Sequence, residues 1–137
     1  MIKRLNFLNV LLLILLFFYS CSPDEEPTTD NRSKLEAAWK CDENSPSFGN
    51  QKYYVEIKID PNSDNYVIID NFFNLGYGKS IIAKFSEPNL IITNQSISGY
   101  IFNGKGTVSS NYNYINWKYT FDEGNGPEEV TATYTKM

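Results

Sequence analysis

The chain has 137 residues, with 12 Lys and Arg against 16 Asp and Glu, so its formal net charge is −4. An acidic chain lacks the basic footprint that nucleic acids and anionic lipid headgroups require, and we expect neither as a partner. The chain has no histidine, which excludes catalytic Ser-His and Cys-His arrangements.

The first twenty residues have the order of a secretory signal peptide. Lys3 and Arg4 give a positive start, and ten apolar residues follow from Val10 to Tyr19. Ten residues are half of the ~20 that a membrane-spanning helix needs, but they match the core of a signal peptide, which has about 7–15. Ser20 is the small residue expected before a cleavage point. We therefore interpret residues 1–20 as a signal peptide.

A cysteine, Cys21, follows the predicted cleavage point. The segment Phe18-Tyr19-Ser20-Cys21 resembles the lipobox of bacterial lipoproteins. The resemblance implies that the Cys21 thiol takes a diacylglycerol, that cleavage occurs before Cys21, and that acyl chains such as palmitate hold the protein on a membrane. Each buried CH₂ contributes about 0.8 kcal/mol, so two or three chains on one residue suffice. The alternative is an ordinary secreted protein with an incidental cysteine.

Residues 21–32 are predicted to be a lipidated, flexible, acidic tether. Prolines and acids dominate the segment, which cannot bury enough apolar area to fold. Asp24-Glu25-Glu26 resembles the signal that sends lipoproteins of Bacteroidota to the cell surface. This resemblance implies an outer-membrane location, with exposure at the cell surface or, alternatively, in the periplasmic leaflet. Since lipidation would occupy Cys21, Cys41 has no disulfide partner, and we expect it to be buried.

Residues 33–137 are predicted to be one all-β domain. Ser33 and Glu36 have the spacing of a capping box, so a short helical turn is expected over 33–38. Apolar and polar residues then alternate along short segments between Gly, Pro and Asn turns. A first strand is expected around Trp39 to Cys41, and later strands at 53–60, 66–72, 80–86, 90–94, 97–103, 105–110, 114–121 and 129–136.

These eight or nine strands leave no room for the long crossovers that parallel pairing needs, so the sheet is predicted to be antiparallel. Short links favour an up-and-down meander that closes into a barrel, because closure removes exposed edges. Trp117, Tyr119 and Phe121 share one face and are expected to fill the interior. Gly104 and Gly106 predict a tight hairpin or a bulge.

Several short motifs carry a further resemblance. Lys34-Leu-Glu-Ala-Ala-Trp39 resembles the helical turn and Gly-x-Trp of lipocalin-like proteins, with Ala37 at the glycine position. The rest of the domain is similar to small lipocalin-like lipoproteins of Bacteroidota at Ile69-Asp-Asn-Phe72, Asn74-Leu-Gly76, Asn89–Gln95, Gly104-Lys-Gly106 and Val130–Lys136. The resemblance implies a small lipocalin-like barrel and no assigned activity.

Candidate metal ligands occur in one turn. Asp60, Asn62 and Asp64 have the 1, 3, 5 spacing of a calcium loop, but Asn65 replaces its glycine and Asn71 its bidentate acid. We therefore predict a plain hairpin turn and no metal site or cofactor.

Two pairs of acids, Asp60 with Asp70 and Glu123 with Glu128, have residue types that hydrolyse glycosidic bonds. Each acid lies at a strand edge or in a loop, where carboxylates are ordinarily solvated. We therefore expect no catalytic residues and no enzyme, with a hydrolase as the least favoured alternative.

Exposed aromatic residues are the one signal for binding. Tyr54, Tyr66, Phe72, Phe73 and Tyr77 could form a platform for sugar rings or apolar ligands. Core and loop packing is the favoured alternative. An interior cavity walled by Tyr53 and Phe85, rather than filled by them, would favour ligand binding.

Three functions follow from the sequence, in this order. The first is a lipid-anchored, noncatalytic envelope lipoprotein that acts as a binding or structural module. The second is a surface protein that binds a glycan or a small apolar ligand, and the third is a hydrolase. The candidate partners are therefore the membrane through Cys21, and a glycan, an apolar ligand or an envelope protein. The residues alone name neither the ligand nor the oligomeric state.

Overall fold

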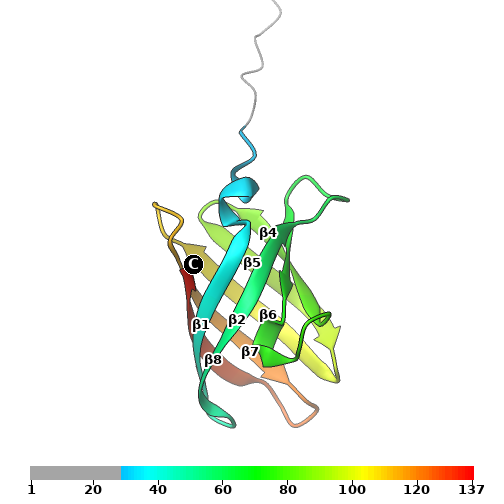
Figure 1. Ribbon diagram of the computed structural model, residues 1–137. Coiled ribbons are helices and arrows are strands. Elements are labelled where there is room, and N and C mark those ends of the chain that lie inside the picture. Colours follow the sequence, from blue (N-terminus) through cyan, green and yellow to red (C-terminus); the bar gives the residue numbers. More distant parts are fainter. Residues whose placement is uncertain (1–28) are drawn as a thin grey trace, which may run out of the picture.

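The computed structural model describes residues 29–137, which form a closed barrel of eight strands in sequence order (Figure 1). The strands are β1 Ala37–Ser45, β2 Gly49–Ile59, β3 Tyr66–Asp70, β4 Ser80–Ser86, β5 Asn89–Ile97, β6 Tyr100–Val108, β7 Tyr114–Asp122 and β8 Glu128–Lys136. Every neighbouring pair is antiparallel, and β1 pairs with β8 to close the sheet. The predicted all-β, up-and-down barrel is confirmed.

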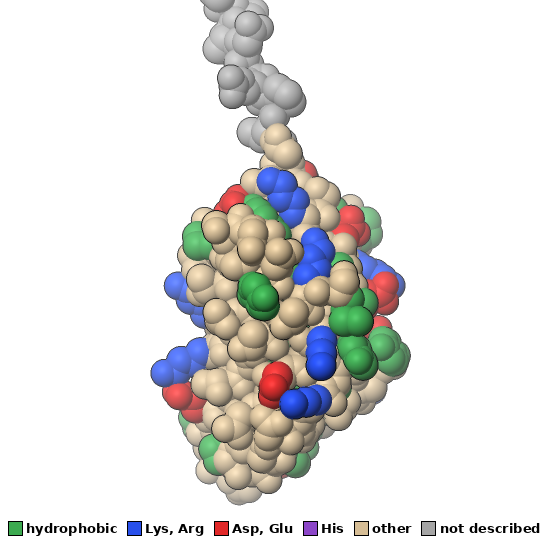
Figure 2. Space-filling model, turned by 60° about the vertical axis from the view of Figure 1, so that its left-hand side comes forward, with side chains coloured by type: hydrophobic (Ala, Val, Ile, Leu, Met, Phe, Trp, Pro, Cys, Tyr) green, Lys and Arg blue, Asp and Glu red, His purple; other side chains and the backbone are tan. Residues whose placement is uncertain are grey.

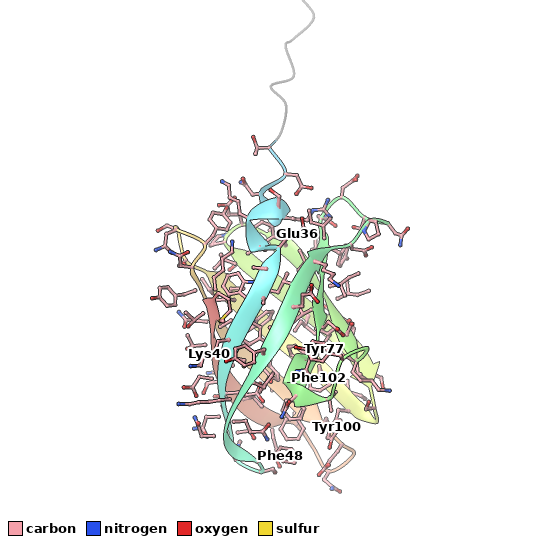
Figure 3. The ribbon with its side chains drawn as sticks, in the orientation of Figure 1. Glu36, Lys40, Phe48, Tyr77, Tyr100 and Phe102 are labelled. Carbon is pink, nitrogen blue, oxygen red and sulfur yellow. The ribbon has the colours of Figure 1, made fainter. Side chains whose placement is uncertain are left out.

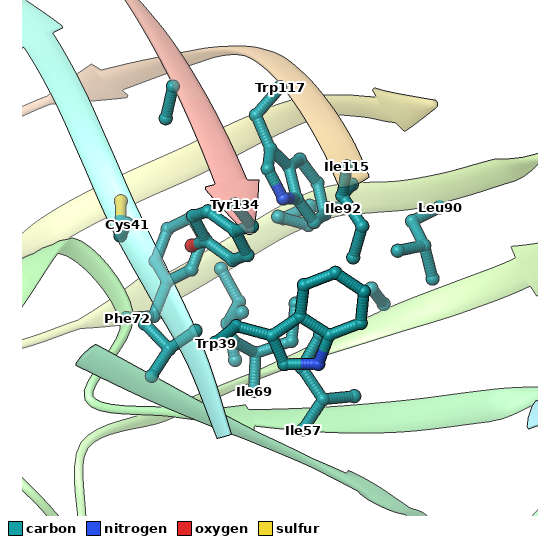
Figure 4. Packing of buried hydrophobic residues seen from close by; sticks show 14 of the residues in the cluster. Trp39, Cys41, Ile57, Ile69, Phe72, Leu90, Ile92, Ile115, Trp117 and Tyr134 are labelled. Carbon is teal, nitrogen blue, oxygen red and sulfur yellow. The ribbon is translucent and has the colours of Figure 1, made fainter. Parts of the chain in front are cut away.

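The interior of the barrel is filled by side chains. Alternate residues of each strand point inward, as the period of two dictates. Trp117, Tyr119 and Phe121 are buried as predicted, and Trp39 and Tyr134 pack with them (Figure 4). An eight-stranded barrel has an interior just wide enough for side chains. Here two tryptophans and several other aromatic rings occupy that space.

Two short 3₁₀ helices accompany the strands, η2 Asn31–Leu35 and η3 Phe72–Asn74. They lie at opposite ends of the barrel. The N-terminal end carries η2 and the loops 60–65, 87–88 and 109–113. The distal end carries η3 and the loops 46–48, 71–79, 98–99 and 123–127. In residues 29–137, no helix has the length and apolar character to span a bilayer.

The predicted helical turn over 33–38 is displaced in the structure. Asp30, not Ser33, caps η2 by accepting a hydrogen bond from the Arg32 backbone N–H. Ser33 Oγ instead donates to the Asp30 carbonyl at 3.0 Å. Glu36 is extended and follows the helix, so the capping box that Ser33 and Glu36 predict is wrong. Aspartate is as good a cap as serine, and here its carboxylate also holds the Arg32 side chain.

Of the two predictions for Gly104 and Gly106, the hairpin is wrong, because both glycines lie inside the continuous strand β6. The chain turns instead at Ser98 and Gly99, which have φ values of 52° and 84°. The predicted bulge has a counterpart on the neighbouring strand: the β5–β6 register shifts between Ile92, which pairs with Gly104, and Gln95. Gly104 pairs with Tyr119 and Gly106 pairs with Trp117 on β7. These two positions lack side chains because the large rings opposite them occupy the interior space.

Candidate binding site at the distal end

Strand β3 ends at Asp70, earlier than the predicted 66–72, because the chain turns into the barrel there. Asn71 and Phe73 adopt left-handed φ angles of 59° and 55°. The turn directs Phe72 into the core, and it places Phe73, 7% exposed, across the distal end. The short helix η3 therefore closes this end of the barrel with two adjacent phenylalanines.

Phe73 is the centre of an aromatic cluster at the distal end. Its ring centroid lies 4.8 Å from that of Phe121, 5.3 Å from Phe102, 5.6 Å from Phe48 and 5.7 Å from Tyr100. Three of these four pairs are edge-to-face, the arrangement that the charge distribution of aromatic rings favours. Rings from four separate segments thus lock together at this end.

The outer side of this cluster is hollowed. A hollow of about 220 Å³ is lined by Phe48, Gln51, Phe73, Asn74, Leu75 and Tyr100. Phe48, on the β1–β2 loop, is 45% exposed and forms part of its wall. In Figure 3, Phe48 and Tyr100 lie at the lower end of the barrel, away from Glu36 near the N-terminal end. The lining combines aromatic rings with two side-chain amides.

Side-chain hydrogen bonds fix the loop that forms one wall of the hollow. The Asn71 amide donates to the Tyr54 carbonyl at 2.7 Å, and the Gly76 N–H donates to Asn71 Oδ1 at 2.8 Å. Asp70 Oδ1 accepts from the Gly78 N–H and from Ser80 Oγ, both at 2.9 Å. The loop is therefore pinned at both ends, which holds Phe73 and Asn74 in place.

A buried polar layer lies behind the aromatic cluster. Glu43 is 2% exposed, and its carboxyl accepts hydrogen bonds from the hydroxyls of Tyr53, at 2.6 Å, and Tyr119. Burial raises the pKa of Glu43, and the two phenol hydrogen bonds oppose this rise. Cys41 is buried as predicted, and burial raises the pKa of its thiol. An un-ionised, buried thiol is a poor nucleophile.

Two polar atoms of the core have no hydrogen bond of normal geometry. They are the Tyr134 hydroxyl and Trp117 Nε1. The Tyr134 hydroxyl lies near that of Tyr53, which donates to Glu43 instead. An unpaired buried polar group destabilises the folded state by about 1–3 kcal/mol.

The candidate calcium loop holds an arginine side chain. The Arg32 guanidinium donates to the carbonyls of Ser63 at 2.6 Å, Tyr66 at 2.9 Å and Asp60 at 3.4 Å. The Asp60 carboxylate accepts from the Asn62 N–H, as in an Asx turn. The predicted hairpin turn between β2 and β3 is confirmed. In residues 29–137 no cluster of three acids or cysteines gathers that would hold a metal.

The structure keeps the first predicted pair of acids, Asp60 and Asp70, apart. Asp60 follows the end of β2 that pairs with Val67, whereas Asp70 pairs with Glu56 near the other end of the ladder. Glu128 accepts a hydrogen bond from Ser47, and Glu123 is exposed in the β7–β8 loop. Asp60 and Asp70 therefore lack the facing geometry that glycoside hydrolysis needs.

The predicted aromatic platform does not form from the residues named for it. Phe72 and Phe73 are packed in the barrel, whereas Tyr54 and Tyr77 are 50% and 70% exposed on the outside. Tyr66 is half-buried near the N-terminal end. The favoured alternative, core and loop packing, holds for the two phenylalanines.

The hollow instead uses residues that the sequence analysis missed, chiefly Phe48, Gln51 and Tyr100. A signal for two of them exists: Phe48 is a large apolar residue in a loop beside Pro46, and Tyr100 follows the turn glycine Gly99.

Two other predictions concern residues away from the hollow. Tyr53 and Phe85 do not wall an internal cavity, because Tyr53 is buried and Phe85 lines a surface hollow beside Arg32. Cys21 lies outside the described residues, and its lipidation stays a prediction.

Comparison with known proteins supports the fold. No protein-family model matches the chain, and no curated protein does. Among solved structures, a redesigned β-barrel is similar with a TM-score of 0.53 and 12% identity, over 82% of this chain and 99% of that one. EF1p2_mFAP2b bound to DFHBI has a TM-score of 0.50 and 12% identity, over 77% and 95%. A de novo designed fluorescence-activating β-barrel has a TM-score of 0.50 and 10% identity, over 79% and 98%. At such identities the likeness shows a small β-barrel and nothing finer.

Proposed function

We propose that this protein is a lipid-anchored, noncatalytic binding module of the bacterial outer membrane. The observation that carries the proposal is the position of the distal hollow. The described chain begins at the N-terminal end of the barrel, and the aromatic hollow lies at the opposite end (Figures 1 and 3). A barrel held through its N-terminus would therefore present the hollow away from the membrane.

The clamp around Arg32 supports this orientation. Asp30 and Arg32 form a salt bridge at 2.7 Å, and Arg32 binds three carbonyls of the β2–β3 loop region. The chain is thereby fixed to the barrel where it emerges from the N-terminal end. The flexible part of the predicted tether, residues 21–32, would then end before Asp30, because Asp30 and Arg32 are held on the barrel.

The burial and hydrogen bonding of the potentially reactive side chains support the noncatalytic part of the proposal. Glu43 and Cys41 are enclosed in the core, and the Glu43 carboxyl is engaged by two phenols. The other acids that the sequence singled out are separated or bound to neighbouring side chains.

The anchor is tested by labelling with palmitate. We expect wild-type protein to take up label and to fractionate with membranes, and Cys21→Ala to lose the label and become soluble. Cys41→Ala is the matched control, because Cys41 is buried in the barrel, and it should keep both properties. An unlabelled wild type together with a membrane-bound Cys21→Ala variant would refute lipid anchoring.

A small apolar ligand inside the barrel is the second candidate function. Two buried donors without a partner among the described residues, Tyr134 Oη and Trp117 Nε1, favour it if the ligand carries acceptor atoms. The likeness to designed β-barrels and to EF1p2_mFAP2b bound to DFHBI also favours it. The filled interior opposes it, because a ligand would have to displace several buried rings.

A further inference from the structure

We propose that the distal hollow binds a single neutral sugar ring, which stacks on Phe48 and Tyr100 and is held by the amides of Gln51 and Asn74. This inference rests on the proposed function, because it names the ligand class of the same site.

The size of the hollow fits one ring. Its volume is about 220 Å³. Pockets for drug-sized ligands have volumes of about 300–1,000 Å³. The hollow therefore suits one pyranose at the end of a glycan, and it is too small for a large hydrophobic ligand.

The aromatic residues offer faces for stacking. Phe48 is 45% exposed and Tyr100 is half-buried, so both rings reach solvent at the distal end. Phe73 lies beneath them and contacts both, at 5.6 Å and 5.7 Å between ring centroids. The C–H face of a pyranose is apolar, and an aromatic surface fixed by such contacts is preorganised to receive it.

The two amides supply the polar half of the site. Asn74 Nδ2 donates to Gln51 Oε1 at 3.4 Å, a long hydrogen bond that leaves most of the donors and acceptors of both side chains free. Asn74 is exposed, and its left-handed φ of 56° keeps it on the outer turn of η3. Paired amides can donate to and accept from adjacent sugar hydroxyls.

The lining of the hollow carries no charged side chain, which disfavours a charged ligand. None of the six lining residues is Asp, Glu, Lys or Arg. A charged ligand would find no counter-charge there, and a purely apolar ligand would leave the two amides without partners. A neutral polyol with one apolar face satisfies both halves of the lining.

The other hollows described on the surface have different linings. The face seen in Figure 2 is mainly backbone and uncharged polar side chains, with scattered charges and a few hydrophobic side chains. One hollow on the outer wall is lined by Thr131, Thr133, Thr135, Asp42, Asn44 and Asn116, with Trp117 and Ala132 between them. It presents hydroxyls and amides, but neither exposed tyrosine of the outer wall, Tyr54 or Tyr114, lines it.

The inference is tested by saturation-transfer difference NMR. The protein, as isolated from expressing cells in a sugar-free zwitterionic detergent, is mixed with glucose, galactose, mannose or N-acetylglucosamine. We expect at least one sugar to show transfer to its ring C–H protons, with a Kd of about 1 mM, since one ring offers few contacts. Phe48→Ala and Asn74→Gly should each weaken binding at least fivefold.

Tyr77→Ala is the control, because Tyr77 is exposed at the same end but does not line the hollow. It should leave the Kd unchanged. Asn74→Gly tolerates the left-handed backbone, so its loss of binding would report the amide and not unfolding. The inference is overturned if no sugar shows transfer, if both hollow variants bind like wild type, or if DFHBI binds in a Phe48-dependent manner and no sugar does. A palmitate-labelled protein without sugar binding would refute this inference while leaving the anchor intact.

Discussion

Glu43 is the one acid buried within the described barrel, and the alternation of β1 places it on the inward face. Its nearest neighbours on that face are Cys41, which is apolar in character, and Ser45. Tyr53 and Tyr119, from β2 and β7, make its burial tolerable by donating to its carboxyl. A sequence pattern places position 43 inward, but it does not reveal partners that arrive from distant strands.

The raised pKa of Glu43 has a consequence for stability. Because the folded protein holds the Glu43 proton more tightly than the unfolded chain, the free energy of unfolding falls as pH rises from about 4 through the folded-state pKa. A glutamine side chain cannot ionise, so Glu43→Gln should lose this fall. We expect the Tm of Glu43→Gln, relative to wild type, to become more positive from about pH 4 to about pH 8.

Thermal unfolding followed by circular dichroism across this pH range measures the effect. Glu129→Gln, which removes one negative charge from the outer wall, controls for net charge. A Tm difference for Glu43→Gln that stays constant or declines with pH would show that Glu43 is not held as described.

Arg32 is a second residue whose role depends on distant partners. Replacement by Gln would leave carbonyls of Ser63 and Tyr66 without their donor, so we expect the free energy of unfolding to fall by about 1–3 kcal/mol. Asp30→Asn keeps Arg32 on those carbonyls and should cost less. Urea denaturation of both variants measures this order, and the reverse order would contradict the clamp.

Among the strands, β6 shows how two neighbours share one interior space. Gly104 and Gly106 of β6 pair with Tyr119 and Trp117 of β7, so β6 has no side chains at the positions where β7 has its largest rings. A Cβ at position 104 would overlap the Cα and Cβ of Tyr119, which cannot move away. A Cβ at position 106 would lie 2.8 Å from Trp117 Cε2, and that ring can shift slightly.

Alanine substitutions in β6 should therefore differ in severity. Gly104→Ala is expected to destabilise by about 3 kcal/mol or more and Gly106→Ala by about 1–2, since overpacking typically costs about 1–3. Lys105→Ala, between them and exposed, should change stability by less than about 0.5 kcal/mol. Equal unfolding midpoints in urea for Gly104→Ala and Lys105→Ala would disprove the close packing.

The strands were predictable because the alternation of apolar and polar residues is a local signal. The distal site was not predictable, because its residues come from separate segments. The alternation of Tyr53, Val55 and Ile57 appears within a few residues and survives in β2. The helix η3 depends on left-handed φ angles at Asn71 and Phe73. The sequence pattern does not reveal these angles, and it predicts a strand followed by a loop there. Phe48 and Tyr100 both reach Phe73 only because the barrel brings the β1–β2 loop and β6 to the same end, so no segment alone indicates the hollow.

The two ends of the barrel are closed in different ways. The N-terminal end is sealed by η2, where Trp39 Nε1 donates to the Leu35 carbonyl at 2.9 Å. The distal end is sealed by rings that leave a polar and aromatic hollow outside. The filled core lies between them, so the ligand proposed for the distal hollow would meet a surface that needs little reorganisation.

A barrel carried on an acylated cysteine has a definite covalent mass, which can be measured on intact protein extracted from membranes. We expect a chain that starts at Cys21 and carries the added mass of a diacylglycerol, alone or with a third acyl chain. A membrane-extracted chain that retains residues 1–20, or that starts at Cys21 without added lipid, would contradict lipid anchoring.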